Sequence, residues 1–518
     1  MSQQEYRVIN PWLIAVSVML ATFMEVLDTT VVNVSLPHIA GSLSVTIDEA
    51  TWALTSYLVA NAIILPMTGW LAGAFGRKRL LMMSVVGFTA SSFMCGLAPN
   101  LATLIVFRIV QGATGGALQP LSQAVLLEAF PPEERGKAMG FWGLGVVVAP
   151  ILGPVLGGWL TDSYSWRWVF YINIPVGVLA IVMTKMFIFD PPYLKQQIRK
   201  IDYWGIGMLA VGIGALQFVL DKGQEDDWFS SHVITTLAVV AVVTLTALII
   251  HELTTDDPIV DLRVFKARSY AVGVFLMTVL GFVLYGSLVL LPIMLQTLLG
   301  YPALQAGIAM APRGVGAFFM MPITGLMTGR FDARKLLTVG LLIGGGTLIW
   351  LAQLNLQAGY WDIFWPQLVQ GVGMSLLFVP LTTVSMDPIP RERMGNATSL
   401  FNLMRNIGGS VGIAATGTML ARHQQSLTAV IGGNVTPYDA ASQSILNQFR
   451  GAFLAAGADA VTATNRAYGA LFGMVQRQAS MVAFVGIFQL LGIVFIAMVP
   501  LVLLMKRPAQ RGQSVGAH

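Results

Sequence analysis

Residues 66–79 read P-M-T-G-W-L-A-G-A-F-G-R-K-R, and residues 322–335 read P-I-T-G-L-M-T-G-R-F-D-A-R-K. Proline, threonine, both glycines, phenylalanine and the closing basic pair recur in the two stretches. At nearly the same offset, V-Q-G at 110–112 recurs at 369–371. These matches predict that the chain contains two copies of one structural unit.

The composition predicts what kind of unit this is. Of 518 residues, 55% are hydrophobic and only 11% are charged, which leaves too little polar surface for a soluble protein. The apolar runs recur along the chain, and each is near the roughly 20 residues that a helix needs to cross a bilayer. We expect fourteen spans, at 12–36, 52–72, 80–98, 103–127, 138–160, 168–188, 203–220, 232–250, 270–298, 304–328, 335–353, 363–386, 397–420 and 481–505.

The repeat predicts how these spans are grouped. The second span matches the tenth and the fourth matches the twelfth, so each copy has six spans and two more are inserted between the copies. The predicted domains are a first half at 1–200, the inserted pair at 201–265, and a second half at 266–518 that includes a long outer loop at 421–480. Parallel halves of this kind are typical of transporters with a central substrate site.

Basic residues predict the orientation in the membrane. If the amino terminus is cytoplasmic, twenty Lys and Arg lie in inner segments and six in outer segments. This bias places both termini in the cytoplasm. The first apolar run is too long for a cleavable signal peptide and carries acids, so we expect it to remain as a span.

The acids lie in the stretch from Glu25 to Pro37, E-V-L-D-T-T-V-V-N-V-S-L-P. Ionisable side chains inside a span are costly, and they usually serve a function. Glu25 and Asp28 are three residues apart, so a helix places them on one face. Burial and like charge favour protonated carboxyl groups, so this pair is the predicted proton-coupling site. The alternative is that Asp28 or Thr29 only caps a helix end near the interface.

Three arginines also fall within predicted spans, at Arg108, Arg313 and Arg405. Arg108 requires a partner, and Glu25 or Asp28 would supply it. Since three cations face two clear acids, at least one guanidinium lacks an acidic partner, and an anionic ligand would offset its charge. We therefore expect a preference for hydrophobic weak acids or neutral amphiphiles over permanent cations. The alternatives are that a backbone carbonyl or water satisfies the unpaired guanidinium, or that Arg313 lies at the outer interface.

Four stretches together resemble the major facilitator superfamily, and within it the fourteen-span drug:proton antiporters. They are Leu27 to Pro37 in the first span, Gly69 to Arg79 between the second and third, R-I-V-Q-G-A-T-G-G from Arg108 in the fourth, and the glycine-rich fifth span. The resemblance covers nearly the whole chain. The residues that match the antiporter and loop motifs are Gly69, Gly76, Arg77, Lys78, Gly153, Pro154, Gly157 and Gly158.

The resemblance implies proton-driven export of small hydrophobic drugs across the cell inner membrane. It implies no cofactor beyond the proton gradient. It also implies a periplasmic adaptor and an outer-membrane channel as partners. The lone Cys95 and the scattered histidines predict no metal site, and the net charge of +5 is a signal of membrane topology, so we expect no nucleic-acid partner. Arg405, Arg313 and Asn33 are the predicted substrate-binding residues, beside Asp28, Glu25 and Arg108 for proton coupling.

The sequence departs from the family patterns in three places. Gly73 replaces an acidic residue in the loop after the second span, Ala149 replaces a glycine of the fifth, and the tenth span carries Arg313 in place of a membrane acid. Arg77 and Lys78 have an alternative reading as topology determinants only. The alternative for the glycines of the fifth span is that they only form a small-residue face on which another helix packs.

Other functions are open to comparison. An exporter of a single endogenous amphiphile, such as a fatty acid or siderophore-like compound, and a nutrient:proton symporter would share this fold. A membrane enzyme is disfavoured because the five histidines are scattered and no nucleophile lies beside a base. The lone Cys95 excludes an internal disulfide. A purely structural protein would leave the charges in the spans without a purpose.

The segment from Ala421 to Ser480 is too polar to cross the membrane. It alternates apolar and polar residues with a helical period, as in S-I-L-N-Q-F-R-G-A-F-L. We expect it to meet the adaptor on the outer side. The alternative is a solvated, disordered loop.

Overall fold

The computed structural model describes residues 10–190, 202–436 and 438–505, except the side chains at 151, 154 and 303. These parts form helices and contain no strand. In chain order they are α1 (Pro11–Leu43), α2 (Ile47–Ala50), α3 (Trp52–Phe75), α4 (Arg77–Leu97), α5 (Leu101–Gly115), α6 (Leu118–Ala129), α7 (Arg135–Ser163), α8 (Trp168–Tyr171), α9 (Asn173–Phe187), α10 (Tyr203–Lys222), η1 (Trp228–Ser230), α11 (His232–Thr254), η2 (Leu262–Lys266), α12 (Arg268–Thr297), α13 (Ala303–Thr328), α14 (Ala333–Leu351), α15 (Tyr360–Met386), η3 (Arg391–Arg393), α16 (Met394–Asn434), α17 (Ala440–Ala455), α18 (Ala460–Ala497) and α19 (Val499–Val502).

Within the described residues, 12 helices are long and apolar enough to cross a membrane. A thirteenth is α7, which bends by 41° between Pro150 and Val155. Pro150 lacks the backbone N–H that a straight helix would use, which favours a bend there. The fold is thus the predicted all-α, multi-pass membrane architecture. The count of fourteen stays a prediction at α16, whose membrane portion carries Arg405 among many Gly, Ser and Thr residues.

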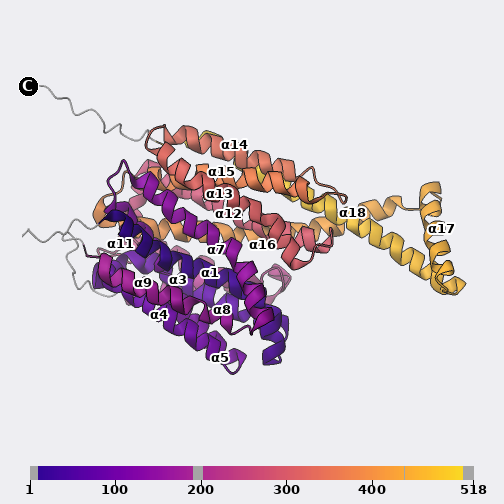
Figure 1. Cartoon of the computed structure of the whole chain (residues 1–518), viewed down its shortest axis with the longest axis horizontal. Helices are drawn as coiled ribbons and strands as arrows, with labels where there is room; N and C mark the ends of the chain where they lie inside the picture. The colour runs from indigo at the N-terminus through magenta and orange to yellow at the C-terminus, as the bar shows by residue number, and fades with distance from the viewer. Residues whose placement is uncertain (1–9, 191–201, 437, 506–518) are drawn as a thin grey trace, which may run out of the picture.

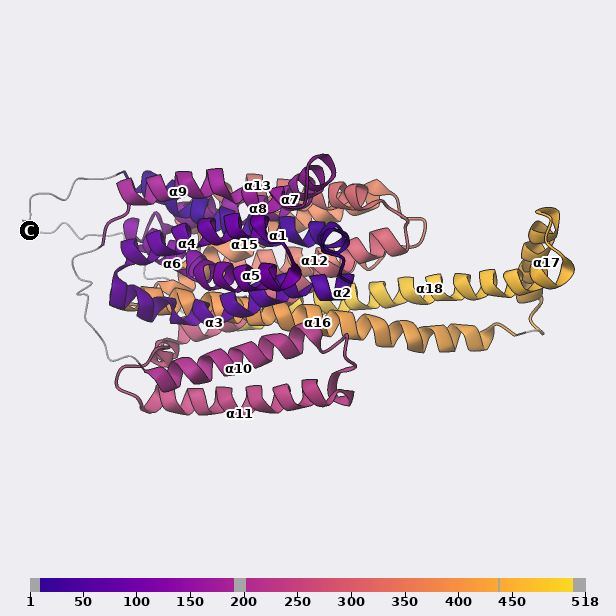
Figure 2. The ribbon, with the colours of Figure 1, turned by 90° about the horizontal axis from the view of Figure 1, so that it is seen from below.

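The two halves meet along pairs of helices that the repeat relates. Helix α7 packs against α13, and α3 packs against α16. The pair α10 and α11 lies along one side of the bundle, where α10 contacts α3 and α16 (Figure 2). Only four of the 23 residues of α11 are buried: Ile234, Ala241, Leu248 and Glu252. The predicted boundary near residue 200 falls outside the described residues, so the division into domains stays a prediction.

The segment at 421–480, predicted as a long outer connection with a helical period, is helical, so the alternative of a disordered loop is wrong. Helix α16 continues to Asn434, α17 crosses the tip, and α18 returns from Ala460, so this segment is a helical arm that projects far beyond the bundle (Figure 1). At 1.5 Å per residue, the 41-residue α16 is about 60 Å long, twice the roughly 30 Å of a hydrocarbon core. The predicted helical period at S-I-L-N-Q-F-R-G-A-F-L is confirmed by α17.

The arm is helical because its two long helices pack along each other. Ala463, Ala467, Val475 and Ala479 are buried on α18 at spacings of four or eight residues, which gives one continuous face. Helices α16 and α18 contact one another, and α17 packs on α18. A disordered loop would lose this packing.

Candidate functional site

The centre of the first half is a buried polar cluster around Asp28, which we name the Asp28 cluster: Asp28, Arg108, Gln111 and Asn173. Arg108 Nη1 donates to Asp28 Oδ2 at 2.6 Å. The other oxygen, Oδ1, accepts from Gln111 Nε2 at 2.9 Å and from Asn173 Nδ2 at 2.7 Å. The side chains of Arg108 and Asp28 are fully buried. Of the two acids that the sequence offered, Arg108 therefore pairs with Asp28.

Further contacts hold the Arg108 guanidinium in place. Its Nε donates to the carbonyl oxygen of Ala53 at 2.9 Å, and its Nη1 also donates to Gln111 Oε1 at 2.8 Å. The Tyr57 ring lies against the guanidinium, with its centroid 4.2 Å away. Asp28 lies in the middle of α1, which runs from Pro11 to Leu43, so the helix-cap alternative is wrong.

Sequence reasoning did not select Gln111 and Asn173. Gln111 lies in the repeated V-Q-G, one turn after Arg108, so the spacing of three residues placed it on the same face. Asn173 begins α9, and its role depends on how α9 packs against α1 and α4. Only the repeated V-Q-G gave a signal, and it pointed to Gln111.

Glu25 belongs to a second group of side chains. Asn61 Nδ2 of α3 donates to Glu25 Oε1 at 3.1 Å. Gln119 of α6 and the positive charge of Arg405 on α16 also act on this carboxyl group. The other oxygen, Oε2, is buried and has no hydrogen-bond partner among the described residues. Glu25 is thus one turn from Asp28 on α1 but faces different neighbours.

The Glu25 group lies where the two halves meet. Arg405 Nη2 of the second half donates to Gln119 Oε1 of the first half at 2.5 Å. One turn away on each helix, Asn402 Nδ2 donates to Gln123 Oε1 at 2.5 Å. Helices α6 and α16 are therefore joined by polar contacts that end at Glu25.

The structure does not bring the three predicted substrate-binding residues together. Arg405 is buried at the interface of the halves. Arg313 is buried on α13, where its Nη2 has no hydrogen-bond partner among the described residues. Asn33 is exposed on α1, more than one turn beyond Asp28.

The loop motif after α3 forms a set of contacts at one end of the bundle, which we name the Arg77 end. Arg77 pairs with Glu128 of α6, and its Nη2 donates to the carbonyl oxygen of Arg391 in the second half at 3.5 Å. Lys78 Nζ donates to the carbonyl oxygen of Lys185 at 2.8 Å. Both residues thus have structural contacts beyond any role in topology.

Two glycines of the loop motif meet backbone requirements. Gly76 joins α3 to α4 with φ of 86°, a conformation that side chains disfavour. A Cβ at Gly69 would lie 2.6 Å from the backbone of Asn396 on α16. Gly69 therefore allows the two halves to approach closely.

The fifth-span motif divides into packed and open positions. A Cβ at Gly157 would lie 3.0 Å from the carbonyl oxygen of Val31, and Gly153 packs as closely against Thr30, so both let α7 approach α1. A Cβ at Gly158 would meet open space, so this glycine is not required for helix packing in this structure. The side chain of Pro154 lies outside the described residues.

Further glycines close the Arg77 end between the halves. A Cβ at Gly136 would lie 2.7 Å from the carbonyl oxygen of Gly325, and one at Gly140 would lie 2.7 Å from that of Met321. These contacts join α7 to α13, beside the α3 and α16 contact at Gly69. The halves are therefore in backbone contact at this end.

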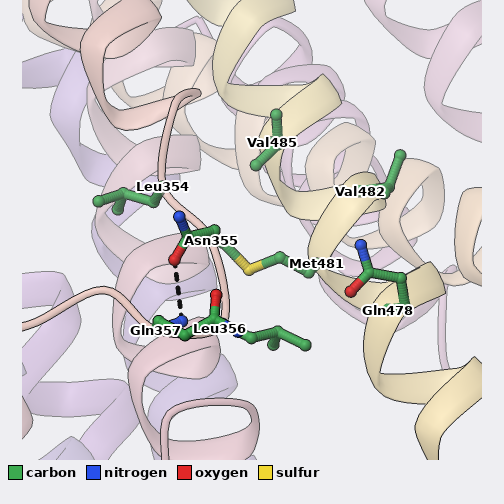
Figure 3. A pocket seen from close by; sticks show the side chains of 8 residues that line it. All are labelled: Leu354, Asn355, Leu356, Gln357, Gln478, Met481, Val482 and Val485. Carbon is green, nitrogen blue, oxygen red and sulfur yellow. Dashed lines mark hydrogen bonds between the residues drawn. The ribbon is translucent and has the colours of Figure 1, made fainter.

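A cavity of about 400 Å³ lies elsewhere, between α18 and the loop that joins α14 to α15 (Figure 3). Its lining residues are Leu354, Asn355, Leu356, Gln357, Gln478, Met481, Val482 and Val485. The lining has no charge and includes none of the predicted site residues. Within the described parts of the chain, no group of three His, Cys, Asp or Glu residues could hold a metal ion.

Comparison with known proteins identifies the fold and the family. The sequence model of the Major Facilitator Superfamily matches residues 18–413. The chain belongs to the major facilitator superfamily. The human organic anion transporter MFSD10 shares the fold with a TM-score of 0.60 at 12% identity, over 94% of this chain and 99% of that one. The proton:xylose symporter XylE gives a TM-score of 0.57 at 18% identity, over 81% and 90%.

Relatives within the superfamily are much more similar in sequence. The multidrug export protein EmrB of Haemophilus influenzae is 43% identical over 84% of this chain and 86% of its own length. EmrB of Escherichia coli K12 is 40% identical over 85% and 86%. The fatty acid resistance protein FarB of Neisseria gonorrhoeae is 38% identical over 96% and 97%.

Proposed function

We propose that this protein exports hydrophobic weak acids and amphiphilic drugs from the cell in exchange for protons, by alternating access between its two halves. The observation that carries the proposal is the buried Asp28–Arg108 pair, together with Glu25 at the interface of the halves. Charges of this kind are retained inside a membrane protein when a transport cycle uses them. The names of the EmrB relatives support multidrug export as the outcome.

The geometry supports Glu25 as the group that couples protons to movement. When its carboxyl group is charged, it attracts Arg405 of the second half and strengthens the contact through Gln119. A proton on Oε2, which has no partner among the described residues, removes this attraction. The halves then separate more readily along α6 and α16. In the same way, a proton on Asp28 would release Arg108 inside the first half, so this pair also couples protons to movement.

The first test uses two conservative substitutions. Asp28→Asn should abolish proton-driven efflux in everted membrane vesicles, and Glu25→Gln should weaken it, with normal amounts of protein in the membrane. Full drug resistance in cells that carry Asp28→Asn would contradict the proposal. Asp162→Asn, at an exposed site near the end of α7, is the matched control.

The substrate preference has its own test. Resistance to a lipophilic weak-acid uncoupler is compared with resistance to ethidium, with and without Arg405→Ala. We expect Arg405→Ala to reduce export of the weak acid more than export of ethidium. If the unmodified protein exports ethidium strongly and ignores the weak acid, the charge argument is wrong.

We place the protein in the cell inner membrane, with the Arg77 end and both termini in the cytoplasm. The twenty-to-six distribution of basic residues supports this orientation. It would place the α16–α18 arm on the outer side, where a periplasmic adaptor and an outer-membrane channel would be met. The orientation is tested with Tyr438→Cys, at an exposed position of the arm. A membrane-impermeant thiol reagent added to intact spheroplasts should label this cysteine.

The adaptor proposal rests on the length and exposure of the arm. Deleting residues 425–478 shortens α16 and α18 together, so we expect membrane insertion to persist and export to fail. If the adaptor still crosslinks to this variant as well as to the unmodified protein, the arm does not bind the adaptor. A shorter deletion of α17 alone separates contact at the tip from contact along the paired helices.

A second candidate is an exporter of one endogenous amphiphile. The match to FarB, a fatty acid resistance protein, over 96% of this chain favours it. A resistance panel in a host that lacks its own pumps distinguishes the two. Protection against long-chain fatty acids alone would support the narrower function.

A further inference from the structure

The second half repeats the Asp28 cluster without its acid. Gln370 corresponds to Gln111 through the repeated V-Q-G, and at the same offset Gln367 corresponds to Arg108. The hydrogen bond recurs as well: Gln367 Nε2 donates to Gln370 Oε1 at 3.3 Å, as Arg108 Nη1 donates to Gln111 Oε1 at 2.8 Å. The fourth-span helix of each half therefore presents the same glutamine in the same way.

Arg313 takes the place that Tyr57 has in the first half. A Cβ at Gly112 would meet the carbonyl oxygen of Tyr57, and a Cβ at the equivalent Gly371 would meet the carbonyl oxygen of Arg313. In the first half the guanidinium on α5 lies against the Tyr57 ring on α3. In the second half the guanidinium belongs to Arg313 on α13, and the residue on α15 that corresponds to Arg108 is the neutral Gln367. The cation is thus on the facing helix, and its backbone packs against Gly371, the residue next to Gln370.

The carboxylate has no counterpart in the second half. Helix α12 packs against α16 as α1 packs against α7, so α12 is the equivalent of the helix that carries Asp28. It contains no Asp or Glu, and it reads L-G-F-V at 280–283, beside the contact of Phe282 with Gly412.

Donors remain where the carboxylate would be. Gln111 Nε2 donates to Asp28 Oδ1, whereas the equivalent Gln370 Nε2 has no hydrogen-bond partner among the described residues. Nη2 of Arg313 also has no partner there, and neither has Nη2 of Arg108, but Arg108 is paired with Asp28 through Nη1 whereas no salt bridge to Arg313 is found among the described residues. One acceptor of this group, Gln367 Oε1, is unpartnered as well. Gln370 is fully buried and Arg313 is 9% exposed. Buried donors without acceptors cost free energy, and a buried cation without an anion costs more.

We propose that Arg313 and Gln370 form a site for the carboxylate of an exported amphiphile, which takes the place that Asp28 holds in the first half. The site lies between α13 and α15, and α13 also contacts α7 of the first half, so it borders the interface that opens during transport. This inference rests on the proposed export function and names its preferred substrate class, single-chain carboxylic acids.

The test measures binding to the full-length protein in lipid nanodiscs. The probes are radiolabelled laurate and dodecanol, which has the same chain length and no charge. The quantity of interest is the ratio of the dodecanol Kd to the laurate Kd. Since a hydrogen bond to a charged group contributes about 1.5–3 kcal/mol, Arg313→Gln should lower this ratio roughly tenfold or more.

Three further variants sharpen the result. Arg313→Lys keeps the charge and should retain most of the preference for laurate. Gln370→Glu supplies an internal carboxylate of nearly the same shape, and it should abolish the preference without enlarging the site. Arg330→Gln removes an exposed arginine just after the same helix and should leave the ratio unchanged.

The inference is overturned if Arg313→Gln has the same ratio as the unmodified protein, or if the unmodified protein does not prefer laurate. A preference that appears only in chloride-free buffer would overturn it too, because an inorganic anion would then occupy the site. Proton-driven efflux of ethidium from everted vesicles tests the export function separately. Efflux without a laurate preference would leave that function standing while this inference fails.

Discussion

The Asp28–Arg108 pair makes the strongest prediction about stability. Three donor groups, from Arg108, Gln111 and Asn173, converge on the two oxygens of the Asp28 carboxylate. In Asp28→Asn the amide has one oxygen, so at least one donor meets an NH2 group, and the buried Arg108 loses its counter-charge. Breaking a buried ion pair by removing one partner costs about 3–5 kcal/mol, so we expect a loss of this size in the free energy of unfolding.

The measurement is equilibrium unfolding of the purified protein in mixed micelles with a denaturing detergent. Arg108→Gln should be destabilised to a similar extent. The double variant Asp28→Asn with Arg108→Gln removes both charges, so it should be less destabilised than the sum of the two single variants by about 2–3 kcal/mol. Asp162→Asn, whose carboxyl group is exposed, should change stability by less than about 0.5 kcal/mol. An unchanged stability of Asp28→Asn, or strict additivity in the double variant, would refute the reasoning.

A Cβ at Gly140 would lie only 2.7 Å from the carbonyl oxygen of Met321, so the side chain of Gly140→Leu cannot fit there. Closure of the Arg77 end and drug efflux should both be lost in this variant. Gly207→Leu, which meets open space on α10, is the control, and efflux that is equal in both variants would contradict the role of this contact. Gly76→Ala forces a side chain into a φ of 86° and should lower stability by about 1–2 kcal/mol, measured as above; a neutral effect would show that the turn relaxes. Hydrogen bonds from Thr462 lower the pKa of Asp459 from its ordinary 3.8, so this cap supports the start of α18 above that pH, and the support is lost as pH falls through the lowered pKa. Proteolysis at the tip of the arm should therefore increase in strong acid for the unmodified protein. The Asp459→Ala variant should be cleaved at every pH. If cleavage of the unmodified tip does not change with pH, the cap does not stabilise α18.

The sequence by itself determined the membrane fold, the repeat and the charged side chains that matter. Apolar runs of membrane length report burial directly, and an acid or arginine inside such a run is buried wherever the helix packs. For this reason the sequence alone identifies five candidate charged residues: Asp28, Glu25, Arg108, Arg313 and Arg405. The helical period also predicted that the segment around α17 is helical.

Only the tertiary structure decided which of these groups meet. Glu25 and Asp28 lie one turn apart on the same helix, yet one faces Arg405 across the halves and the other faces Arg108 within the first half. Neighbours on a single helix follow from its period, whereas neighbours on different helices follow from packing angles that the pattern of apolar residues does not contain. For the same reason the sequence showed the helical period of the arm but not that α16 and α18 pack along each other. Their stability comes from contact with each other rather than from an apolar run.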